Sequence, residues 1–412
     1  MDSFYEKKII LITGSTGFVG LVLLKTILSK LASVSKIILP VRKTANIDPQ
    51  IKNDPRIHLI SGFDLSKKGL GLAKESLLKT VNIVFHSAAI VQWNVPFHQH
   101  IQVNALATLE LLDLCKSPCL ELFVHFSTTA VGSIPSPFNI FNPSTKLMKE
   151  DIDKTAVQLA LGKIQKEQDP NFDGSSLFPG SEEKTLGRNY YCYSKLLLEH
   201  LLYSKSSHDV PILIVRLCSI DPSFEFPNPG FGHKYHGAGV FTLKAGITIG
   251  KGRILPDHDI QPINSWPVDL CVHSILAHTA YHSRLTQGSS SNFRVINMSS
   301  NQRNPVSLLD RFEASSHIVG PITRMPVKEA TTVLLKRAQN GDIQAKTNLT
   351  ILRWYVNNVK ISYHDENMRS VLDLLSLDEG KRFKSDITLV HWPTLLKNAA
   401  DEYYYLHSTS KL

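Results

Sequence analysis

The run Ile9-Ile10-Leu11-Ile12-Thr13-Gly14-Ser15-Thr16-Gly17-Phe18-Val19-Gly20 decides the fold of this chain. Four β-compatible apolar residues lead into three glycines, and an apolar-rich run of helical pattern continues to about Leu31, which predicts strand, tight turn and helix. Gly14 would permit the turn, Gly17 a close approach of a pyrophosphate to the backbone, and Gly20 tight packing of helix on strand. Because a pyrophosphate would lie on the helix N-terminus, the residues from Thr13 to Gly20 are candidate dinucleotide ligands.

Length and composition limit the classes of function. A chain of 412 residues is long enough for two domains or for one large α/β domain with appendages. Its net charge of +9 is spread along the chain, which suits anionic small molecules better than nucleic acid. The five cysteines are scattered, so we expect a reducing compartment and neither a disulfide framework nor a zinc site. No apolar run approaches the roughly 18 residues of a membrane span, and the N-terminus lacks the form of a signal peptide.

Two more strands are expected to end beside the adenosine half of the dinucleotide. The first, Lys36–Leu39, runs into the basic pair Arg42-Lys43. An arginine at this place accommodates a 2′-phosphate, whereas NAD sites carry an acidic residue, so Arg42 helped by Lys43 predicts NADPH. The second, Ile57–Ile60, leads to Asp64-Leu65, where the Asp64 carboxylate either bonds the adenine edge or caps the following turn.

Two further strands predict the reactive half of the site. The fourth strand, Val81–His86, runs into Ser87-Ala88-Ala89, whose small side chains allow a cofactor to lie close to the backbone. The fifth, Leu122–Phe126, ends in Ser127-Thr128-Thr129, and hydroxyls at the tip of a parallel strand stand where open α/β sheets place ligands. Between them, Val103-Asn104-Ala105-Leu106 opens a predicted amphipathic helix that runs to about Cys115, and a buried Asn104 amide there would need hydrogen-bond partners.

The helical run after Asn189 contains a tyrosine and a lysine that share one face. Tyr191 and Lys195 are four residues apart, so both project from the same side of a helix. A phenol with a pKa near 10 is a poor acid-base catalyst at neutral pH, but a neighbouring ammonium stabilises the phenolate and lowers that pKa. Downstream of a glycine turn and a hydroxyl-rich strand end, this pair predicts a catalytic phenol.

Together these motifs resemble the extended short-chain dehydrogenases/reductases and, within them, the fatty acyl-CoA reductases. The 62 positions from Thr129 to Tyr191 are like the insertion of that family. The region from Ser370 to Trp392 resembles its appended male-sterility-type domain. The matching motifs occur in family order: Thr13 to Gly20, Leu39 to Arg42, Gly62-Phe63-Asp64-Leu65, Phe85 to Val91, Val103-Asn104, Val124 to Thr128, and Tyr191 to Lys195.

The resemblance implies NADPH-dependent reduction of a long-chain acyl-CoA, through a thiohemiacetal and an aldehyde, to a fatty alcohol with release of CoA. Tyr191 would donate the proton, and Lys195 would lower the phenol pKa and hold the ribose hydroxyls. Thr128 or Thr129 would bond the developing oxyanion, with the choice among these two and Ser127 left open. Asn104 would match the asparagine that helps to order a proton path.

The same resemblance implies the domain organisation. Residues 1–325 would form an NADPH-binding, Rossmann-type domain with a doubly wound parallel sheet. Residues 326–407 would form a smaller, mainly helical domain, with amphipathic candidates at Thr332–Ala338 and Leu349–Val356. This part would cap an acyl tunnel or serve as a packing or dimerisation module, so a homodimer is one possibility. Residues 408–412 would be a flexible tail.

Three other stretches carry secondary expectations. His233, Lys234 and His236 either meet the phosphates of CoA or belong to a solvated loop. Asp257-His258-Asp259 lacks partners at zinc spacing, so no metal is expected. The last residues, Ser410-Lys411-Leu412, match a peroxisomal address read by an import receptor, which predicts a peroxisomal matrix protein.

Two alternative functions remain open at the level of sequence. One is an NADPH-dependent carbonyl or hydroxysteroid-type reductase of the same superfamily, which needs no CoA. The other is a non-catalytic NADPH-binding module. Leu217 and Gln92 depart from the family pattern, where a proline and a basic residue are usual, and this bears on the substrate more than on the fold.

Overall fold

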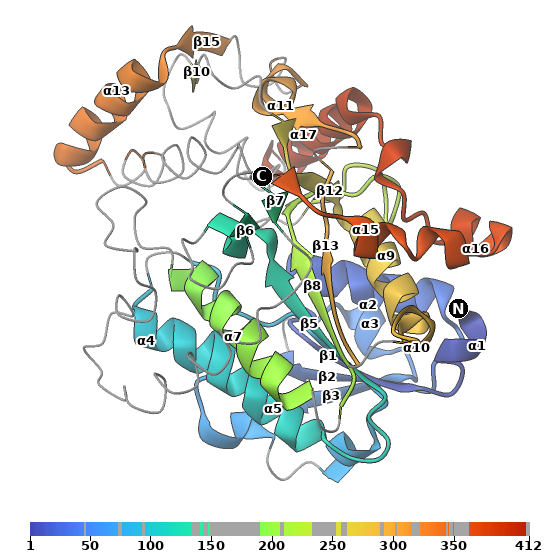
Figure 1. The fold of residues 1–412 in the computed structure, drawn as a ribbon. Coiled ribbons are helices and arrows are strands. Elements are labelled where there is room, and N and C mark those ends of the chain that lie inside the picture. The colour runs from blue at the N-terminus through green and yellow to red at the C-terminus, as the bar shows by residue number, and fades with distance from the viewer. Residues whose placement is uncertain are drawn as a thin grey trace.

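The chain folds around a seven-stranded parallel sheet with helices on both faces (Figure 1). The computed structural model describes residues 1–44, 47–72, 76–92, 95–133, 141–142, 147–148, 190–206, 210–232, 253–256, 262–288, 292–300, 303–314, 316, 322–342, 345, 349 and 362–408. The strand order is β13-β8-β5-β4-β1-β2-β3, and every neighbouring pair is parallel. The bounds are β1 Ile9–Thr13, β2 Lys36–Val41, β3 Ile57–Ser61, β4 Ile83–His86, β5 Leu122–Thr128, β8 Ile212–Leu217 and β13 Phe293–Asn297. Since the winding reverses between β1 and β4, the predicted doubly wound Rossmann-type fold is confirmed.

The main helices form one layer on each face of the sheet. Figure 1 shows α2 (Phe18–Lys30) and α9 (Val268–Ala280) on one side, and α5 (Ala107–Cys115) and α7 (Tyr190–Ser206) on the other. Each layer has its own buried apolar cluster, one containing α2 and α9 and the other α5 and α7. The strands between them are buried on both faces, which explains their nearly continuous apolar sequences.

The alternation of side chains along β1 divides its residues between the two cores. Ile10 and Ile12 pack with the α2 layer, while Leu11 packs with the α5 layer. All three are fully buried. An extended strand imposes this period of two on its side chains, so it also decides toward which face of the sheet the Thr13 side chain points.

Further elements surround this framework. The other helices are α1 Asp2–Tyr5, α3 Pro49–Lys52, α4 Phe97–His100, α10 His282–Leu285, α11 Leu308–Ala314, α13 Val327–Gln339, α15 Glu366–Arg369, α16 Leu377–Arg382 and α17 Trp392–Ser408. The 3₁₀ turns are η2 Lys68–Gly71, η3 Ser76–Thr80, η5 Thr129–Ser133, η7 Leu372–Leu374 and η8 Ile387–Leu389, and η4 Ile101–Leu106 is a π-helix. The short strands are β6 Phe141–Asn142, β7 Leu147–Met148, β9 Ser219–Asp221, β10 Arg253–Pro256, β11 Pro262–Ile263, β12 Ser265–Pro267, β14 Val306–Ser307, β15 Ile322–Met325 and β16 Ser362–Tyr363.

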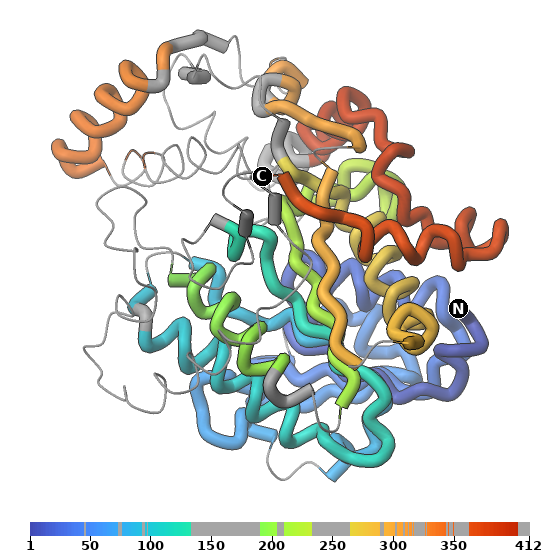
Figure 2. The backbone as a smooth tube through the Cα atoms, viewed as in Figure 1, coloured from blue at the N-terminus to red at the C-terminus, as the bar shows by residue number. Residues whose placement is uncertain are grey.

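The last part of the chain packs onto the α2 side of the Rossmann fold. Met368, Phe383 and Trp392 are buried in the same apolar cluster as Ile10 and Ile12. The tube in Figure 2 shows this C-terminal stretch returning past the N-terminal helix. By contrast α13 lies out beside β10 and β15, with a small apolar cluster of its own. The region after residue 325 is thus attached to the sheet chiefly through its final fifty residues or so.

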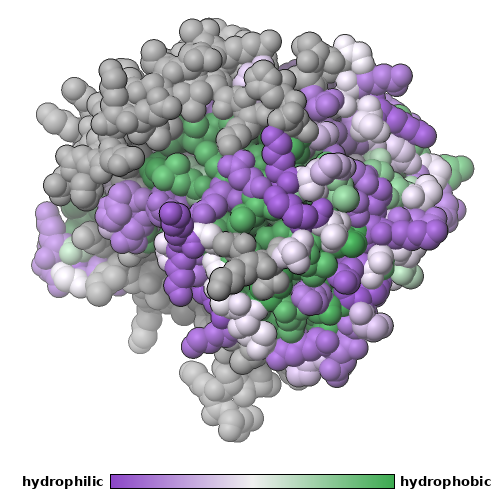
Figure 3. Space-filling model, turned by 90° about the horizontal axis from the view of Figure 1, so that it is seen from below, coloured by the Kyte–Doolittle hydropathy of each residue, from purple (hydrophilic) through white to green (hydrophobic). Residues whose placement is uncertain are grey.

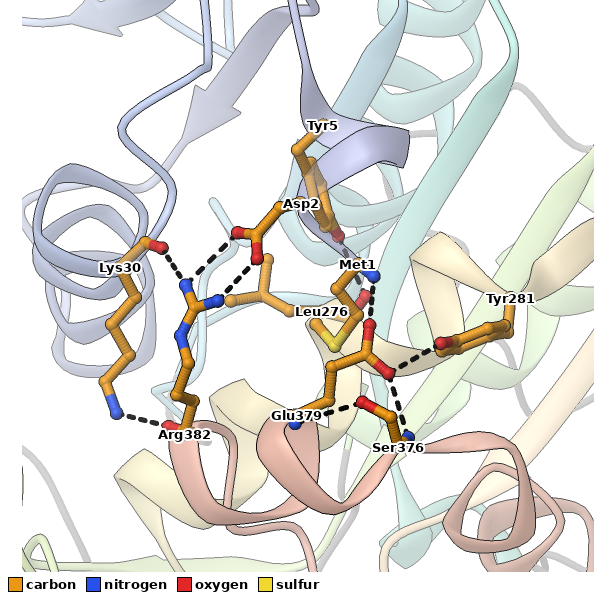
Figure 4. A network of polar contacts seen from close by, with 9 residues as sticks. All are labelled: Met1, Asp2, Tyr5, Lys30, Leu276, Tyr281, Ser376, Glu379 and Arg382. Atoms are coloured by element: carbon orange, nitrogen blue, oxygen red, sulfur yellow. Dashed lines mark hydrogen bonds and ion pairs between the residues drawn. The ribbon is translucent and has the colours of Figure 1, made fainter.

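Polar contacts at α16 fasten the N-terminal residues to the C-terminal part of the chain (Figure 4). The Glu379 carboxylate pairs with the amino group of Met1 and accepts a hydrogen bond of 2.8 Å from the Tyr281 hydroxyl. The Arg382 guanidinium pairs with Asp2 and donates to the Lys30 carbonyl at 2.6 Å. Burial alone would raise the pKa of Glu379, but the bonds that its carboxylate receives from the Met1 amino group, Ser376 and Tyr281 lower it to about 2.

The face drawn in Figure 3 carries both polar and apolar residues. Hydrophilic residues surround the face drawn in Figure 3, and hydrophobic residues reach the surface between them. Within the part of the chain that the structure describes, no helix combines the length and the apolar character needed to cross a bilayer.

Candidate active site

The glycine turn after β1 brings two backbones into close approach. Gly14 has a φ of +71°, and a Cβ built on it would lie 2.7 Å from the backbone nitrogen of Ala88. A Cβ on Gly20 would lie 2.2 Å from the Gly14 carbonyl oxygen. No side chain fits at either position, because in both cases the obstacle is backbone. The turn therefore rests directly on the loop after β4 and on the first turn of α2.

The same turn is built to receive an anionic group. The N-cap of α2 is Gly17, which has no side chain with which to cap the helix. The first-turn N–H groups and the positive end of the helix dipole therefore point toward the turn. The buried Ser15 hydroxyl has no hydrogen-bond partner among the described residues. A pyrophosphate would satisfy these donors, so the residues present fit a dinucleotide.

At the ends of β2 and β3 the structure places Arg42 and Lys43 on the surface, and Asp64 near Arg42. The Asp64 Oδ1 atom accepts hydrogen bonds from the Ser66 backbone nitrogen at 3.0 Å and the Ser66 hydroxyl at 2.7 Å. These bonds, with a smaller contribution from Arg42, lower the pKa of Asp64. The Asp64 carboxylate therefore caps the turn, which is one of the two roles that the sequence predicted for it. The Leu65 side chain is buried in the α5-side core.

A buried histidine at the end of β4 connects the glycine turn to α5. The Thr13 hydroxyl lies 2.7 Å from His86 Nδ1 and accepts a bond of 3.2 Å from the Ala88 backbone nitrogen. His86 Nε2 lies 2.9 Å from the Thr108 hydroxyl, which donates to the Asn104 carbonyl at 3.0 Å. Burial, followed by the nearby Lys195 charge, lowers the pKa of His86 to about 3, so the ring is neutral. His86 was not among the residues predicted for the site, although a histidine closing a buried strand is itself unusual.

Asn104 lies in the π-helix between α4 and α5. Its Oδ1 accepts a bond of 2.8 Å from the Ile90 nitrogen, and its Nδ2 donates to the Ile90 carbonyl at 2.9 Å. Nδ2 also reaches the Ser194 hydroxyl at 3.0 Å and His100 Nδ1 at 3.2 Å. The amide therefore ties the loop after β4 to α7. Asn104 lies in a six-residue π segment, and such segments are rare and frequently occur at functional sites.

The predicted tyrosine and lysine lie on α7 and face the tip of β5. The Tyr191 hydroxyl lies close to the Thr128 side chain. Burial raises the pKa of Tyr191 above its ordinary value, with Thr128 acting in the opposite direction. This corrects the expectation that the Lys195 ammonium lowers the pKa of the phenol, because in this structure Lys195 is directed elsewhere.

Lys195 is turned toward the sheet. Its Nζ donates to the Phe126 carbonyl at 2.7 Å and lies 3.5 Å from His125 Nε2. Burial lowers the pKa of Lys195 to about 7, and the Glu199 carboxylate one helical turn further on opposes the shift. His125 is buried and neutral, its pKa held well below the usual range by burial and by the Lys195 charge. The sequence analysis missed His125 as a neighbour of the lysine.

The three hydroxyls at the tip of β5 have three different partners. Ser127 donates to Glu199 Oε1 at 2.5 Å, and Thr129 donates to the Leu217 carbonyl at 3.4 Å. Only Thr128 meets the Tyr191 phenol. The geometry thus separates residues that spacing in the sequence left equivalent.

Glu199 belongs to a buried ion pair that the sequence did not indicate. Its Oε2 lies 2.6 Å from the Arg216 guanidinium, and both side chains are fully buried. Arg216 stands near the end of β8, so this pair connects α7 to the strand beside β5. A regular signal was available in the sequence, since Tyr191, Lys195 and Glu199 repeat every four residues along one helix face.

Several predicted features lie outside the described residues. These are His233, Lys234, His236, the run Asp257-His258-Asp259, the helix candidate beyond Leu349, and Ser410-Lys411-Leu412. Within the described ranges, no group of three or more histidine, cysteine or acidic residues is arranged to hold a metal ion.

The doubly wound sheet, the glycine turn at its switch point and the tyrosine-lysine face of α7 define an extended short-chain dehydrogenase/reductase. Residues 12–275 match the model of an NAD-binding family described as "Male sterility protein". The chain belongs to this family, and it is an oxidoreductase that uses a nicotinamide cofactor. The resemblance to the fatty acyl-CoA reductases predicted from the motifs is confirmed.

Individual relatives are similar over almost the whole chain. Fatty acyl-CoA reductase 1 of Gallus gallus is 24% identical over 461 aligned positions, which cover 97% of this chain and 84% of the relative. Fatty acyl-CoA reductase 1 of Homo sapiens is 23% identical with the same coverage. Among solved structures, the terminal R domain of the myxalamid PKS-NRPS pathway aligns with a TM-score of 0.69 at 17% identity, covering 98% of this chain and 92% of that domain.

Proposed function

We propose that the protein reduces long-chain fatty acyl-CoA to fatty alcohol with NADPH, through a thiohemiacetal and an aldehyde, and releases CoA. The names of its relatives suggest the acyl-CoA substrate. The observation that carries the proposal is the proximity of the Tyr191 hydroxyl and the Thr128 side chain at the carboxyl end of β5. This pair offers one proton donor and one hydroxyl at the edge of the sheet where this fold places ligands.

The side chains have separate roles in the proposed reaction. When bound, the nicotinamide supplies hydride to the carbonyl carbon. The Tyr191 hydroxyl donates its proton to the carbonyl oxygen as negative charge develops there, and Thr128 donates a hydrogen bond to the same oxygen. Lys195, one helical turn after Tyr191, donates to the Phe126 carbonyl, and its pKa of about 7 leaves its charge sensitive to pH. Asn104 fixes α7 against the loop after β4.

The bond changes balance over two rounds. In the first, the thioester carbon gains hydride and its oxygen gains the Tyr191 proton, which gives a thiohemiacetal. Cleavage of the C–S bond, with transfer of the hydroxyl proton to sulfur, releases CoA thiol and an aldehyde. In the second, the aldehyde gains hydride and a proton and becomes the primary alcohol. Two NADPH are consumed for each thiol released.

NADPH is preferred in this proposal because of the basic pair that follows β2. Arg42 and Lys43 are exposed at the end of the strand, where the 2′ position of the adenosine ribose is bound in this fold. No acidic residue occupies either position. A guanidinium there pairs with the 2′-phosphate of NADPH. A 2′-hydroxyl, as in NADH, is bound better by a carboxylate.

The test is NADPH oxidation with palmitoyl-CoA, with released thiol measured in the same sample. The proposal predicts thiol release in step with NADPH oxidation, at a ratio of two NADPH per thiol. A wild-type protein that oxidises NADPH with simple ketones or steroids, and releases no thiol from acyl-CoA, would instead be a carbonyl reductase of the same superfamily. A protein that binds NADPH and oxidises it with neither class of substrate would be a binding module.

A further inference from the structure

A short stretch near the C-terminus reaches the reactive edge of the sheet. It is fastened along β13, the edge strand, by side chains of both partners. The Asn297 amide donates to the His364 carbonyl at 2.9 Å, and the Asn367 amide donates to the Val295 carbonyl at 3.0 Å. Arg294 donates to the Asn367 carbonyl at 2.9 Å. These bonds fix the backbone of residues 364–367 beside the carboxyl half of β13.

Because residues 364–367 are held beside β13, the preceding residue, Tyr363, lies at the tip of β5. Tyr363 is 6% exposed, and its hydroxyl lies close enough to the Thr129 side chain to oppose the rise of the Tyr363 pKa. The ring belongs to the apolar cluster on the α7 side of the sheet, together with Cys192. Burial raises the pKa of Tyr363, and the thiols of Cys192 and Cys218 lie near enough to add to the shift. The ring is therefore enclosed between the tip of β5, the start of α7 and the end of β8.

The contacts around Tyr363 form a closed chain that links β5, α7, β8, β13 and the stretch that contains Tyr363. Ser127 at the tip of β5 bonds Glu199 on α7, and Glu199 pairs with Arg216 on β8. Arg216 lies 3.5 Å from the Asn297 amide oxygen on β13, and Asn297 bonds the backbone of His364. Tyr363, the neighbour of His364, then returns to Thr129, two residues after Ser127. The backbone that carries Thr128 is thus held from both sides.

Because both neighbours of Thr128 have fixed partners, the threonine that meets the phenol has little freedom to move. We propose that Tyr363 is a positioning residue of the active site, which holds Thr129 and thereby sets Thr128 against Tyr191. The C-terminal stretch then completes the reactive half of the site as well as packing on the sheet. This inference rests on the proposed function, since it assigns a role in the same carbonyl reduction.

A double-mutant cycle between Tyr363 and Thr129 tests the inference. Tyr363→Phe keeps the buried ring and removes only the hydroxyl, and Thr129→Val removes its partner at nearly constant volume. Each single variant is expected to lower kcat about tenfold, as the loss of one positioning contact does. The double variant is expected to be no slower than the slower single variant, because both changes break the same contact.

Two further measurements separate positioning from a general loss of structure. The dissociation constant of NADPH is expected to stay within about twofold in all variants, since the glycine turn is untouched. The matched control is Tyr281→Phe, which also removes a tyrosine hydroxyl bound to the C-terminal part of the chain, at Glu379. Tyr281 follows α9 at the amino-terminal end of the sheet, so this control is expected to keep wild-type kcat.

The cycle is run with palmitoyl-CoA and with a long-chain aldehyde. A kcat within twofold of wild type for Tyr363→Phe, or strictly additive losses in the double variant, would overturn the positioning role. Equal losses of kcat in Tyr281→Phe and Tyr363→Phe would also overturn it. If wild type reduces the aldehyde and leaves acyl-CoA untouched, the proposed function is wrong, while the cycle still reports on Tyr363 through the aldehyde. If wild type reduces neither, both proposals are wrong.

Discussion

The two halves of the site are built in different ways. The cofactor half, from Gly14 to Gly20, is local in sequence and consists of backbone: a turn, close approaches and a bare helix N-terminus. The reactive half consists of side chains that converge from distant positions, such as Thr128, Tyr191 and Tyr363. One short motif is therefore sufficient to form the cofactor half. The reactive half forms only when the whole sheet and the C-terminal stretch are folded together.

This difference sets what each half tolerates. A change in the backbone half blocks the site by collision, because no flexible group can move aside. A change in the reactive half leaves the binding turn intact and misplaces a proton donor or its supports. Variants in the two halves should accordingly separate NADPH binding from turnover, and the following predictions use that separation.

The largest effect is expected from Tyr191→Phe. Loss of the proton donor should lower kcat about 10³-fold, because general acid catalysis by one positioned group contributes about 10²–10⁴. The dissociation constant of NADPH should change little, since the glycine turn is untouched. Steady-state kinetics and a fluorescence titration of NADPH check both values. A variant that keeps more than a tenth of wild-type kcat would show that another group donates the proton.

Glu199→Gln should be the most destabilising of these changes. It leaves the Arg216 guanidinium buried without its counter-charge, and breaking a buried pair in this way costs about 3–5 kcal/mol of the free energy of unfolding. Urea denaturation measures the loss. The double variant Glu199→Gln/Arg216→Met removes both charges and should recover part of it. If the single variant is as stable as wild type, the pair does not join α7 to β8 in solution.

Gly20→Ala should damage the cofactor half and spare the reactive half. The new Cβ would lie 2.2 Å from the Gly14 carbonyl oxygen, so the turn must open, and NADPH affinity should fall about 100-fold. Gly380→Ala on α16 is the matched control, since a Cβ there meets nothing within 4 Å. It should leave affinity unchanged. Unaltered NADPH binding in Gly20→Ala would contradict the close packing of helix and turn.

The pH dependence of turnover should report Lys195. If the protonated amine is the active form, kcat should decline as pH rises through about 7, the pKa of Lys195 in the folded protein. Because Glu199 raises that pKa, Glu199→Gln should move the alkaline limb to lower pH, provided that the assay is run at a temperature where the variant is folded. Glu199→Asp, which keeps the charge, should move it less. An alkaline limb that is the same in all three proteins would exclude this role for the lysine.

The same pKa shift makes a prediction for stability. Burial holds the pKa of Lys195 below that of an unfolded lysine, near 10.4, so the unfolded chain binds the extra proton between about pH 7 and 10. The Lys195 contribution to the free energy of unfolding therefore rises with pH across this window. Comparison of the slope with that of Lys195→Met, by denaturation at several pH values, isolates the effect. Identical slopes would contradict the burial of a titrating amine.

The smallest effect is expected from Arg42→Ala. An exposed guanidinium beside a 2′-phosphate contributes modestly, so the preference for NADPH over NADH in kcat/KM should fall about tenfold. The loss should appear in the KM of NADPH and leave NADH unaffected. If the wild type has the same kcat/KM with NADPH and with NADH, Arg42 has no preference to lose, and NADPH is not the natural reductant.

The sequence was sufficient for the parts that depend on local pattern. The apolar strands, the glycine turn and the four-residue spacing of Tyr191 and Lys195 follow from periodicity and backbone chemistry, and the strands appear at nearly the predicted bounds. The helix containing Asn104 was predicted too short, because it begins at Phe97 and passes through a π segment that no period of 3.6 anticipates.

The parts that depend on tertiary contact could not be predicted in this way. Ser127, Thr128 and Thr129 are equivalent in the sequence, and only the positions of Glu199 and Tyr191 distinguish them. The pKa of Tyr191 was expected to fall because spacing places Lys195 on its face. The structure directs the ammonium into the sheet instead, so burial decides the shift.

The central claim is tested most directly by following the hydride. Wild-type protein is incubated with palmitoyl-CoA and NADPH deuterated at both C4 hydrogens, and the lipid products are analysed by mass spectrometry. The account predicts hexadecanol with two deuterium atoms on C1, together with one free CoA thiol per alcohol, and no labelled alcohol with Tyr191→Phe. Unlabelled palmitoyl-CoA recovered in full from the wild-type reaction, with NADPH bound and unoxidised, would contradict it.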